Sequence, residues 1–273
     1  MKKIFFVLLP LTLLISSMSG AQQRIVSLNG AISEMLCSLG LESQIAGVDV
    51  TSNFPASLRQ KASVGHNRNI SAEGILALHP TLILGVKDEL KPEVLEQLKS
   101  ANVKVQLIPQ AFSAEGTRTM LTEIAKVTNT VEKGKELLSK FDKEMAALKI
   151  APTGKKVLFV YARGAGSMTV CGTGQSPDHM IKLAGASNAM TDFKDFKPLS
   201  AEAVVAANPD VILLFDSGLQ SVGGVDGLLK VPGVSSTNAG KNKKIISMDG
   251  QFLSGFGLRL PQAIQQLNKK IIG

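Results

Sequence analysis

The chain has 273 residues and a formal net charge of +8, and its aromatic residues include one Tyr and no Trp. Proteins that bind nucleic acid usually gather Lys and Arg into a dense patch or present aromatic rings on which bases stack. The basic residues are scattered here and aromatic residues make up only 4% of the chain, so the composition argues against a nucleic-acid partner. An anionic small molecule is an equally good match for the positive charge.

The first residues have the pattern of a secretory signal peptide. Lys2 and Lys3 precede an apolar stretch at residues 4–15, and residues 19–21 are small, as a signal peptidase requires. The stretch is shorter than a transmembrane helix. No cysteine follows the small residues, which argues against a lipid anchor. We therefore expect a cleaved signal peptide at residues 1–21 and a soluble periplasmic protein.

After this segment, short apolar strand patterns alternate with helical patterns. This alternation is typical of α/β lobes with parallel sheets and crossover helices. The expected strands cover residues 24–28, 45–48, 81–85 and 103–108 in the first half of the chain, and residues 156–161, 168–171, 211–215 and 244–248 in the second half.

The middle of the chain, residues 114–149, lacks strand character and carries apolar residues at helical spacing. A break at Thr128-Asn129-Thr130 divides it, and Thr130 is a suitable N-cap for a helix of about twenty residues. We expect this helix, within residues 129–150, to connect two lobes stiffly. The same spacing also fits a surface helix of the first lobe.

A pattern of six residues recurs 129 positions later in the chain. A period of this length excludes solenoid repeats, whose units run about 20 to 50 residues. We therefore predict a duplicated α/β protein with an N-terminal lobe at residues 22–128, a C-terminal lobe at residues 151–273, and a ligand cleft between them. The matching residues are Ser71 and Ser200, Ala72 and Ala201, Glu73 and Glu202, Pro80 and Pro209, Ile83 and Ile212, and Leu84 and Leu213.

Two cysteines, Cys37 and Cys171, fall in different predicted lobes. A disulfide between them would tie together parts that need to move. We expect both to be small buried hydrophobic residues, with a disulfide in the exported protein as the less favoured alternative.

The loop from Gly172 to Pro177 imitates the start of a dinucleotide-binding fingerprint. Pro177 replaces the last glycine of that motif, and an exported protein meets little nicotinamide cofactor. We interpret the loop as a turn whose backbone N–H groups face an anionic part of a ligand. No other arrangement of residues supports catalysis, so an exported enzyme is a distant alternative.

Three segments carry a resemblance to a known family: residues 24–28 (RIVSL), residues 64–74 (VGHNRNISAEG) and residues 197–202 (KPLSAE). They closely resemble the haemin-binding periplasmic proteins of bacterial ABC importers, whose larger group includes cobalamin and ferric-siderophore carriers. The resemblance implies two Rossmann-like lobes joined by a single long helix. It also implies a monomeric, non-enzymatic carrier that captures haem and delivers it to an inner-membrane ABC permease, touching the membrane complex only peripherally. A ferric-siderophore or cobalamin carrier is the alternative.

The resemblance also suggests ligand-binding residues. His66 stands where many haem-binding members have the tyrosine that ligates iron, and Phe196 stands where many have a second tyrosine. Imidazole is itself a common axial ligand of haem iron, so we expect His66 to bind the metal in place of tyrosinate. Arg68 is expected to pair with a haem propionate or to support the ligand, and Lys197 has a similar claim from the opposite lobe.

Other candidates follow from position. Met168 and Phe196 are expected to lie against the porphyrin faces. His179 is expected in the first turn of a helix capped by Ser176, where it is either a second ligand or a solvated or packed side chain. His79, whose counterpart in the repeat is Asn208, is interpreted as a polar residue at a helix end.

Glu73 and Glu202 occupy matched positions in the two lobes, as a two-fold membrane partner would require, and resemble the acidic residues that relatives present to arginines of the permease. The alternative is that each is the N3 glutamate of a capping box.

Overall fold

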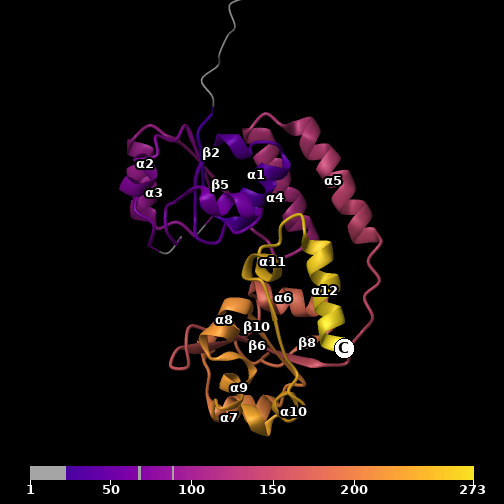
Figure 1. The fold of residues 1–273 in the computed structure, drawn as a ribbon. Coiled ribbons are helices and arrows are strands. Elements are labelled where there is room, and N and C mark those ends of the chain that lie inside the picture. The colour runs from indigo at the N-terminus through magenta and orange to yellow at the C-terminus, as the bar shows by residue number, and fades with distance from the viewer. Residues whose placement is uncertain (1–22, 67–68, 88) are drawn as a thin grey trace, which may run out of the picture.

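The computed structural model describes residues 23–66, 69–87 and 89–273, and these form two α/β lobes, one above the other in Figure 1. The predicted signal peptide at residues 1–21 and the predicted propionate partner Arg68 lie outside the described residues. None of the helices in the described part of the chain has the length and hydropathy needed to span a bilayer.

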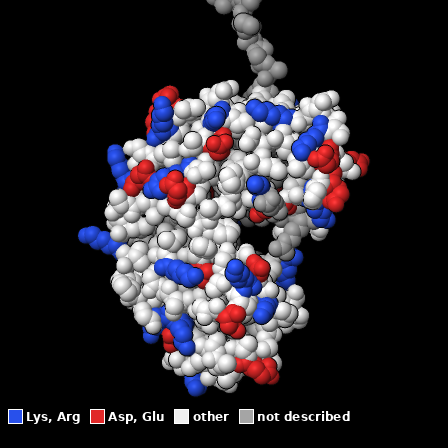
Figure 2. Space-filling view, turned by 180° about the vertical axis from the view of Figure 1, so that it is seen from behind, with Lys and Arg blue, Asp and Glu red and all other residues white. Residues whose placement is uncertain are grey.

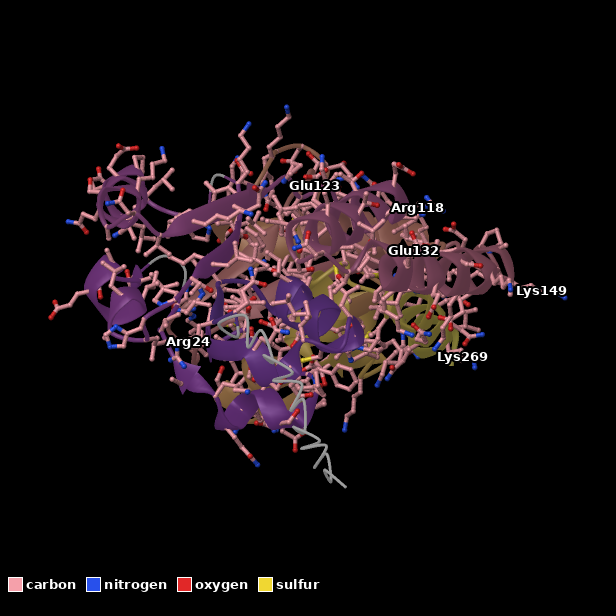
Figure 3. The ribbon with its side chains drawn as sticks, turned by 90° about the horizontal axis from the view of Figure 1, so that it is seen from above. Arg24, Arg118, Glu123, Glu132, Lys149 and Lys269 are labelled. Carbon is pink, nitrogen blue, oxygen red and sulfur yellow. The ribbon has the colours of Figure 1, made fainter. Side chains whose placement is uncertain are left out.

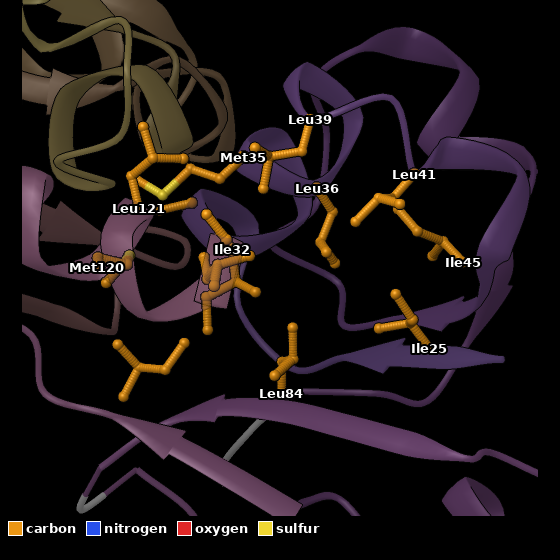
Figure 4. Packing of buried hydrophobic residues seen from close by; sticks show 14 of the residues in the cluster. Ile25, Ile32, Met35, Leu36, Leu39, Leu41, Ile45, Leu84, Met120 and Leu121 are labelled. Carbon is orange, nitrogen blue, oxygen red and sulfur yellow. The ribbon is translucent and has the colours of Figure 1, made fainter. Parts of the chain in front are cut away.

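The first lobe contains a five-stranded parallel sheet in the order β3-β2-β1-β4-β5. Its core lies on both faces, because adjacent residues of one strand point to opposite sides. On one face Ile25 and Leu84 pack against two helices (Figure 4), and on the other face Val26 and Ile83 pack against two more. The strands are β1 (Ile25–Ser27), β2 (Ile45–Val48), β3 (Ala62–Ser63), β4 (Leu82–Val86) and β5 (Lys104–Ile108). The helices are α1 (Gly30–Ser38) and α4 (Ala114–Val127) on the first face, and α2 (Ala72–Leu76) and α3 (Pro92–Ser100) on the second.

The second lobe is built on a mixed sheet in the order β11-β10-β6-β7-β9, with β8 also paired to β6. One face is covered by α6, α11 and α12, and the other by α7 to α10. The strands are β6 (Lys156–Ala162), β7 (Met168–Cys171), β8 (Ser187–Asn188), β9 (Phe196–Pro198), β10 (Val211–Phe215) and β11 (Ile245–Met248). The helices are α6 (Ser176–Leu183), α7 (Ala201–Ala207), α8 (Asp216–Ser221), α9 (Gly224–Leu229), α10 (Asn238–Lys241), α11 (Gly250–Ser254) and α12 (Leu260–Ile272).

The α/β class and the two lobes agree with the sequence prediction, but the second sheet is not fully parallel. β7 runs antiparallel to β6 and β9 runs antiparallel to β7. The five residues between β6 and β7 form a tight hairpin closed by the Arg163 N–H, which donates to the carbonyl of Ser167 at 2.9 Å. A connection this short cannot return the chain for a parallel pairing.

The duplication is visible in the local structure. Ser71 and Ser200 are the N-caps of α2 and α7, and each hydroxyl oxygen accepts from the backbone N–H three residues later. After these helices, His79 and Asn208 both adopt positive φ, 47° and 40°. The prediction that His79 is a helix-end residue is thus confirmed.

The long helix α5 (Val131–Ala146) spans both lobes along one side of the molecule (Figure 1). Its Leu137 and Leu138 pack on the core of the first lobe, and its Phe141 belongs to the core of the second. With 16 residues it is shorter than predicted, and the side chain of Thr130 makes no capping bond. Arg118 of α4, labelled in Figure 3, bridges to Asp142 of α5 at 2.7 Å.

Both cysteines are free thiols; Cys171 is buried, as predicted, whereas Cys37 is only partly buried. Burial is the main cause that raises the pKa of each thiol from 9.0 to about 12. At pH 8 only about one thiol in ten thousand would then be the reactive thiolate. We expect Ellman's reagent to label neither cysteine of the native protein within minutes at pH 8, and to label both at once in guanidinium chloride. Rapid labelling without denaturant would contradict this expectation.

Candidate ligand cleft between the lobes

The carboxyl ends of the two sheets face each other across the lobe boundary. Gln251, which follows β11, binds backbone groups of Asn53 and Phe54, which follow β2, and of Gly30, which follows β1. In α/β sheets, ligands bind outside the carboxyl ends of the strands. Figure 2 shows a hollow between the two lobes on the rear face of the molecule. The boundary between the lobes is therefore the candidate ligand site.

His66 lies in the loop that leaves the carboxyl end of β3 in the first lobe. It follows the edge strand β3 and is half-buried. Gly65, with φ of 91°, lets the chain turn at this point, and its carbonyl accepts from the Val50 N–H at 3.1 Å. The His66 carbonyl accepts from the Asn69 N–H at 2.7 Å, which directs the chain back toward α2. The histidine is thus presented by a loop held at the carboxyl end of the sheet.

Tyr161 lies near the carboxyl end of β6 in the second lobe, and the sequence analysis missed it. Its phenol oxygen accepts a hydrogen bond from Arg163 Nε at 2.7 Å. The Arg163 guanidinium also lies 5.3 Å from the centre of the Tyr161 ring. The only signal in the sequence was that Arg163 lies two positions after Tyr161, close enough in the chain for the two side chains to meet.

Aromatic rings surround Tyr161. Phe196 and Phe215 meet its ring edge to face, with centroids 6.4 and 6.0 Å away. Phe159 supports both phenylalanines from the buried core. Phe196 is 39% exposed, so its ring remains available to an apolar ligand.

Met168 and Lys197, which were predicted to accompany Phe196, lie on the other face of the second sheet. Phe196 pairs with Cys171, which packs under α6, whereas Lys197 pairs with Val170 on the opposite face. Met168 packs on that opposite face too. The Lys197 ammonium lies 4.5 Å from the centre of the Phe193 ring. The structure therefore groups Phe196 with Tyr161 and separates it from Met168 and Lys197.

His179 lies in the first turn of α6, as predicted, but the N-cap is Gln175 instead of Ser176. Its half-buried ring is 5.8 Å from the ring of Phe112, which belongs to the segment between β5 and α4. Phe112 in turn contacts Phe256 at 5.3 Å. His179 is therefore packed at the contact between the lobes.

Three N–H groups of the loop before α6 already have partners inside the second lobe, contrary to our interpretation of the loop as an anion-binding turn. Gly172 and Thr173 donate to the backbone carbonyls of Asp195 and Phe193, in the segment before β9, and Gly174 donates to the carboxylate of Asp178 at 2.9 Å. Asp178 is fully buried and also accepts from Lys182 at 2.9 Å and from Asn188 at 3.1 Å. The loop is closed around its own carboxylate.

A cavity of about 390 Å³ opens at one side of the boundary, lined by residues of both lobes. Its lining contains three cations, Arg59, Arg259 and Lys270, and two acids, Asp216 and Asp249. These residues could not be grouped from the sequence, because they come from distant segments of the chain.

Glu73 and Glu202 are both exposed, at the second position of α2 and of α7. The N3 positions are held by Gly74 and Ala203, so the capping-box alternative for the two glutamates is wrong. Figure 1 places α2 at the outer edge of the first lobe and α7 at the far end of the second.

Residues 25–252 match the protein family described as periplasmic binding protein. The chain belongs to this family. Its members are substrate-binding components of transporters and not enzymes.

Solved structures similar to this periplasmic binding protein include three that are named for haem binding. The apo form of the periplasmic heme-binding protein RhuT from Roseiflexus sp. RS-1 is 38% identical, with a TM-score of 0.87, over 92% of this chain and 98% of that one. BhuT in complex with two hemes is 35% identical, with a TM-score of 0.87, over 91% and 97%. HutB of Vibrio cholerae is 35% identical, with a TM-score of 0.81, over 93% and 100%.

Curated relatives are more distant. The uncharacterized ABC transporter substrate-binding lipoprotein YvrC of Bacillus subtilis is 23% identical over 91% of this chain and 80% of its own length. The vitamin B12-binding protein of Salmonella typhi is 25% identical over 71% and 73%.

Asp178 provides a test of the closed loop. Burial alone would raise the pKa of this carboxyl, but the hydrogen bonds from Lys182, Gly174 and Asn188 outweigh burial and lower its pKa below the ordinary 3.8. The ionised form therefore stabilises the folded state above pH 3.8, and this stabilisation is lost as the pH falls through the folded-state value. Asp178→Asn should reduce the free energy of unfolding at pH 7 by about 1–3 kcal/mol. The difference from wild type in urea unfolding should shrink between pH 4 and pH 2, and a constant difference would contradict the assignment.

Proposed function

We propose that this periplasmic binding protein captures haem between its lobes and delivers it to an inner-membrane ABC importer. The observation that carries the proposal is the presence of two groups able to ligate iron, His66 and Tyr161, at the facing carboxyl ends of the two sheets. The similarity to proteins named for haem binding, at 35–38% identity over nearly the whole chain, supports the same ligand. We further propose export by a cleaved signal peptide and action as a soluble monomer.

His66 is proposed as the iron ligand of the first lobe. A loop histidine at the end of an edge strand can turn its ring toward the cleft without disturbing the sheet. Imidazole binds haem iron through one nitrogen and carries no charge that must be compensated.

Tyr161 is proposed as the ligand of the second lobe. A phenolate ligand carries a negative charge, and the Arg163 guanidinium already donates to the phenol oxygen at 2.7 Å. Charge-assisted hydrogen bonds of this kind are stronger than neutral ones and would stabilise the phenolate on iron. The exposed ring of Phe196 would lie against the porphyrin, as predicted from the sequence.

The cations of the site would neutralise the haem propionates. Arg68 remains the predicted partner on the first lobe. Lys197, predicted for the same role, points to the sheet face opposite Tyr161, so we assign it a minor part.

Haem binding should depend on both lobes. His66→Ala should weaken haemin binding more than tenfold, or about 1.4 kcal/mol, in a titration followed by visible absorption. Tyr161→Phe should remove the phenolate-to-iron charge-transfer bands of the ferric complex while leaving the fold intact. His79→Ala, which changes a histidine away from the cleft, should change neither property.

Each outcome separates the candidates. Unchanged affinity and spectrum in His66→Ala would transfer the first-lobe role to another residue. The cobalamin alternative would be favoured if haemin gave no Soret band shift with the wild-type protein and cyanocobalamin bound tightly. The similarity to vitamin B12-binding proteins supports that alternative.

Glu73 and Glu202 are proposed as docking contacts for the permease. Each glutamate is exposed and lies three residues before an apolar residue at a matched position, Leu76 in α2 and Val205 in α7. Leu76 is partly exposed and Val205 is 45% exposed. A shallow groove next to Glu73 is lined by Leu76 and neighbouring residues of α2 and α3. Matched acidic and apolar groups on two similar lobes suit a partner with two-fold symmetry.

Reversing both docking charges should stop delivery without affecting capture. Glu73→Lys with Glu202→Lys should abolish haem transfer to vesicles that contain the importer, because cations would then meet the cations of the permease. Haemin affinity should stay unchanged. The control is Glu132→Lys with Glu136→Lys on α5, which makes the same change in net charge. Transfer that persists in the first variant would refute the docking role.

A further inference from the structure

A second-lobe segment, residues 249–259, contacts the first lobe through one buried ion pair. Arg259 donates from Nε and Nη2 to the same oxygen, Glu34 Oε2, at 2.9 and 2.7 Å. The side chain of Glu34, in α1, is only 6% exposed and that of Arg259 is 26% exposed. The two residues lie 225 positions apart in the chain, so their contact joins the lobes and not neighbouring parts of one lobe.

Gln251 makes a second connection with all the hydrogen-bonding capacity of its amide. Its Nε2 donates to the Gly30 carbonyl at 2.8 Å and to Glu34 Oε2 at 3.3 Å, and its Oε1 accepts from the N–H groups of Asn53 and Phe54 at 2.8 and 3.0 Å. A side-chain amide has two donors and two acceptor positions, and each is used here by the opposite lobe.

The Arg259 guanidinium also lies between two aromatic rings, one from each lobe. Its central carbon is 3.7 Å from the centre of the Phe54 ring and 5.0 Å from that of Phe252. Such stacking suits a planar guanidinium, and lysine could not reproduce it. Gly30 permits the close approach of Gln251, because a Cβ at Gly30 would lie 3.1 Å from the side-chain amide carbon of Gln251.

We propose that Glu34, Gln251, Phe54 and Arg259 form an interlobe latch that sets the distance between the lobes in the haem-free protein. Opening the lobes would separate Arg259 from Glu34 and leave a buried carboxylate without its cation, which is strongly unfavourable. Charged hydrogen bonds near 2.8 Å are also more sensitive to displacement than apolar contacts, so the latch favours one lobe angle.

The proposed consequence for ligand binding rests on the proposed haem site. A cleft held at one width keeps His66 and Tyr161 ready to bind the same iron. Without the latch, the protein would spend part of its time too open for both ligands to reach it, and the apparent affinity falls by the fraction of time spent in the competent state. Glu34, Gln251 and Arg259 are positioning residues in this scheme and do not touch the haem.

The test measures the distance between lobes directly. Nitroxide labels at Lys104→Cys in the first lobe and Lys241→Cys in the second, both exposed positions, would report it by double electron–electron resonance, with Cys37 and Cys171 replaced by Ala. Arg259→Met, which removes the charge but keeps the stem, should give a longer and broader distance distribution in the haem-free protein. If the open state then fills about nine-tenths of the population, haemin affinity should fall about tenfold.

Two further variants keep the test decisive. The charge swap Glu34→Arg with Arg259→Glu should partly restore the wild-type distance. Gln251→Ala, which leaves the ion pair in place, should broaden the interlobe distance distribution less than Arg259→Met does. It also allows the latch to be tested if Arg259→Met does not fold.

The matched control is Lys182→Met, which removes the cation from the buried carboxylate of Asp178 inside the second lobe. It should lower the melting temperature and leave the interlobe distance unchanged. An unchanged distribution in both Arg259→Met and Gln251→Ala would overturn the latch. A wider distribution in a protein that never binds haemin would support the latch and refute the proposed function instead.

Discussion

The structure depends on the contact between residues 249–259 and the first lobe, because this contact decides which edges of the two sheets face each other. Apolar packing alone is not directional and would allow the lobes to slide. The hydrogen bonds of Gln251 to the loops after β1 and β2 fix the position of one lobe relative to the other. Thr117 of α4 adds a bond to the Phe256 carbonyl at 2.8 Å. Both carboxyl edges are thereby brought to one boundary, where a ligand can touch both lobes.

In the second lobe, contacts with neighbouring residues hold the Tyr161 side chain in place. Arg163 follows Tyr161 by two residues and lies in the tight turn after β6. Its guanidinium therefore reaches the phenol oxygen of Tyr161 without help from another element. The edge-to-face packing of Phe196 and Phe215 restricts the tyrosine ring. Aromatic pairs of this kind add about 0.5–1.5 kcal/mol to the area they bury. A ring held in this way loses little conformational entropy when it binds a ligand.

Features coded by local pattern could be predicted from the sequence, and features that depend on distant pairing could not. The repeat identified the two matched helices, the strands that follow them and the helix-end residues His79 and Asn208, since each depends on a few adjacent residues. The strand β7 was predicted, but its antiparallel direction was not, because a strand pattern carries no direction, and the three-residue strand β9 was not predicted. Met168 was grouped with Phe196 because the pairing register, which sets the face of each residue, comes from the partner strand. Glu34 and Arg259 could not be paired at all from spacing.

The two lobes repeat the same local elements but are proposed to present different chemistry to the cleft. Each keeps the serine cap and the exposed glutamate, which belong to the outer surface, whereas the first lobe offers a loop histidine and the second a strand phenol. If both groups bind one iron, as proposed, each ligand is tied to a different lobe, and affinity depends on the distance between lobes. A permease that grips Glu73 and Glu202 would then need only to pull the lobes apart to break an iron bond. Release would require no chemical change in the haem, and the strength of the contact between the lobes would set the force that the importer must supply.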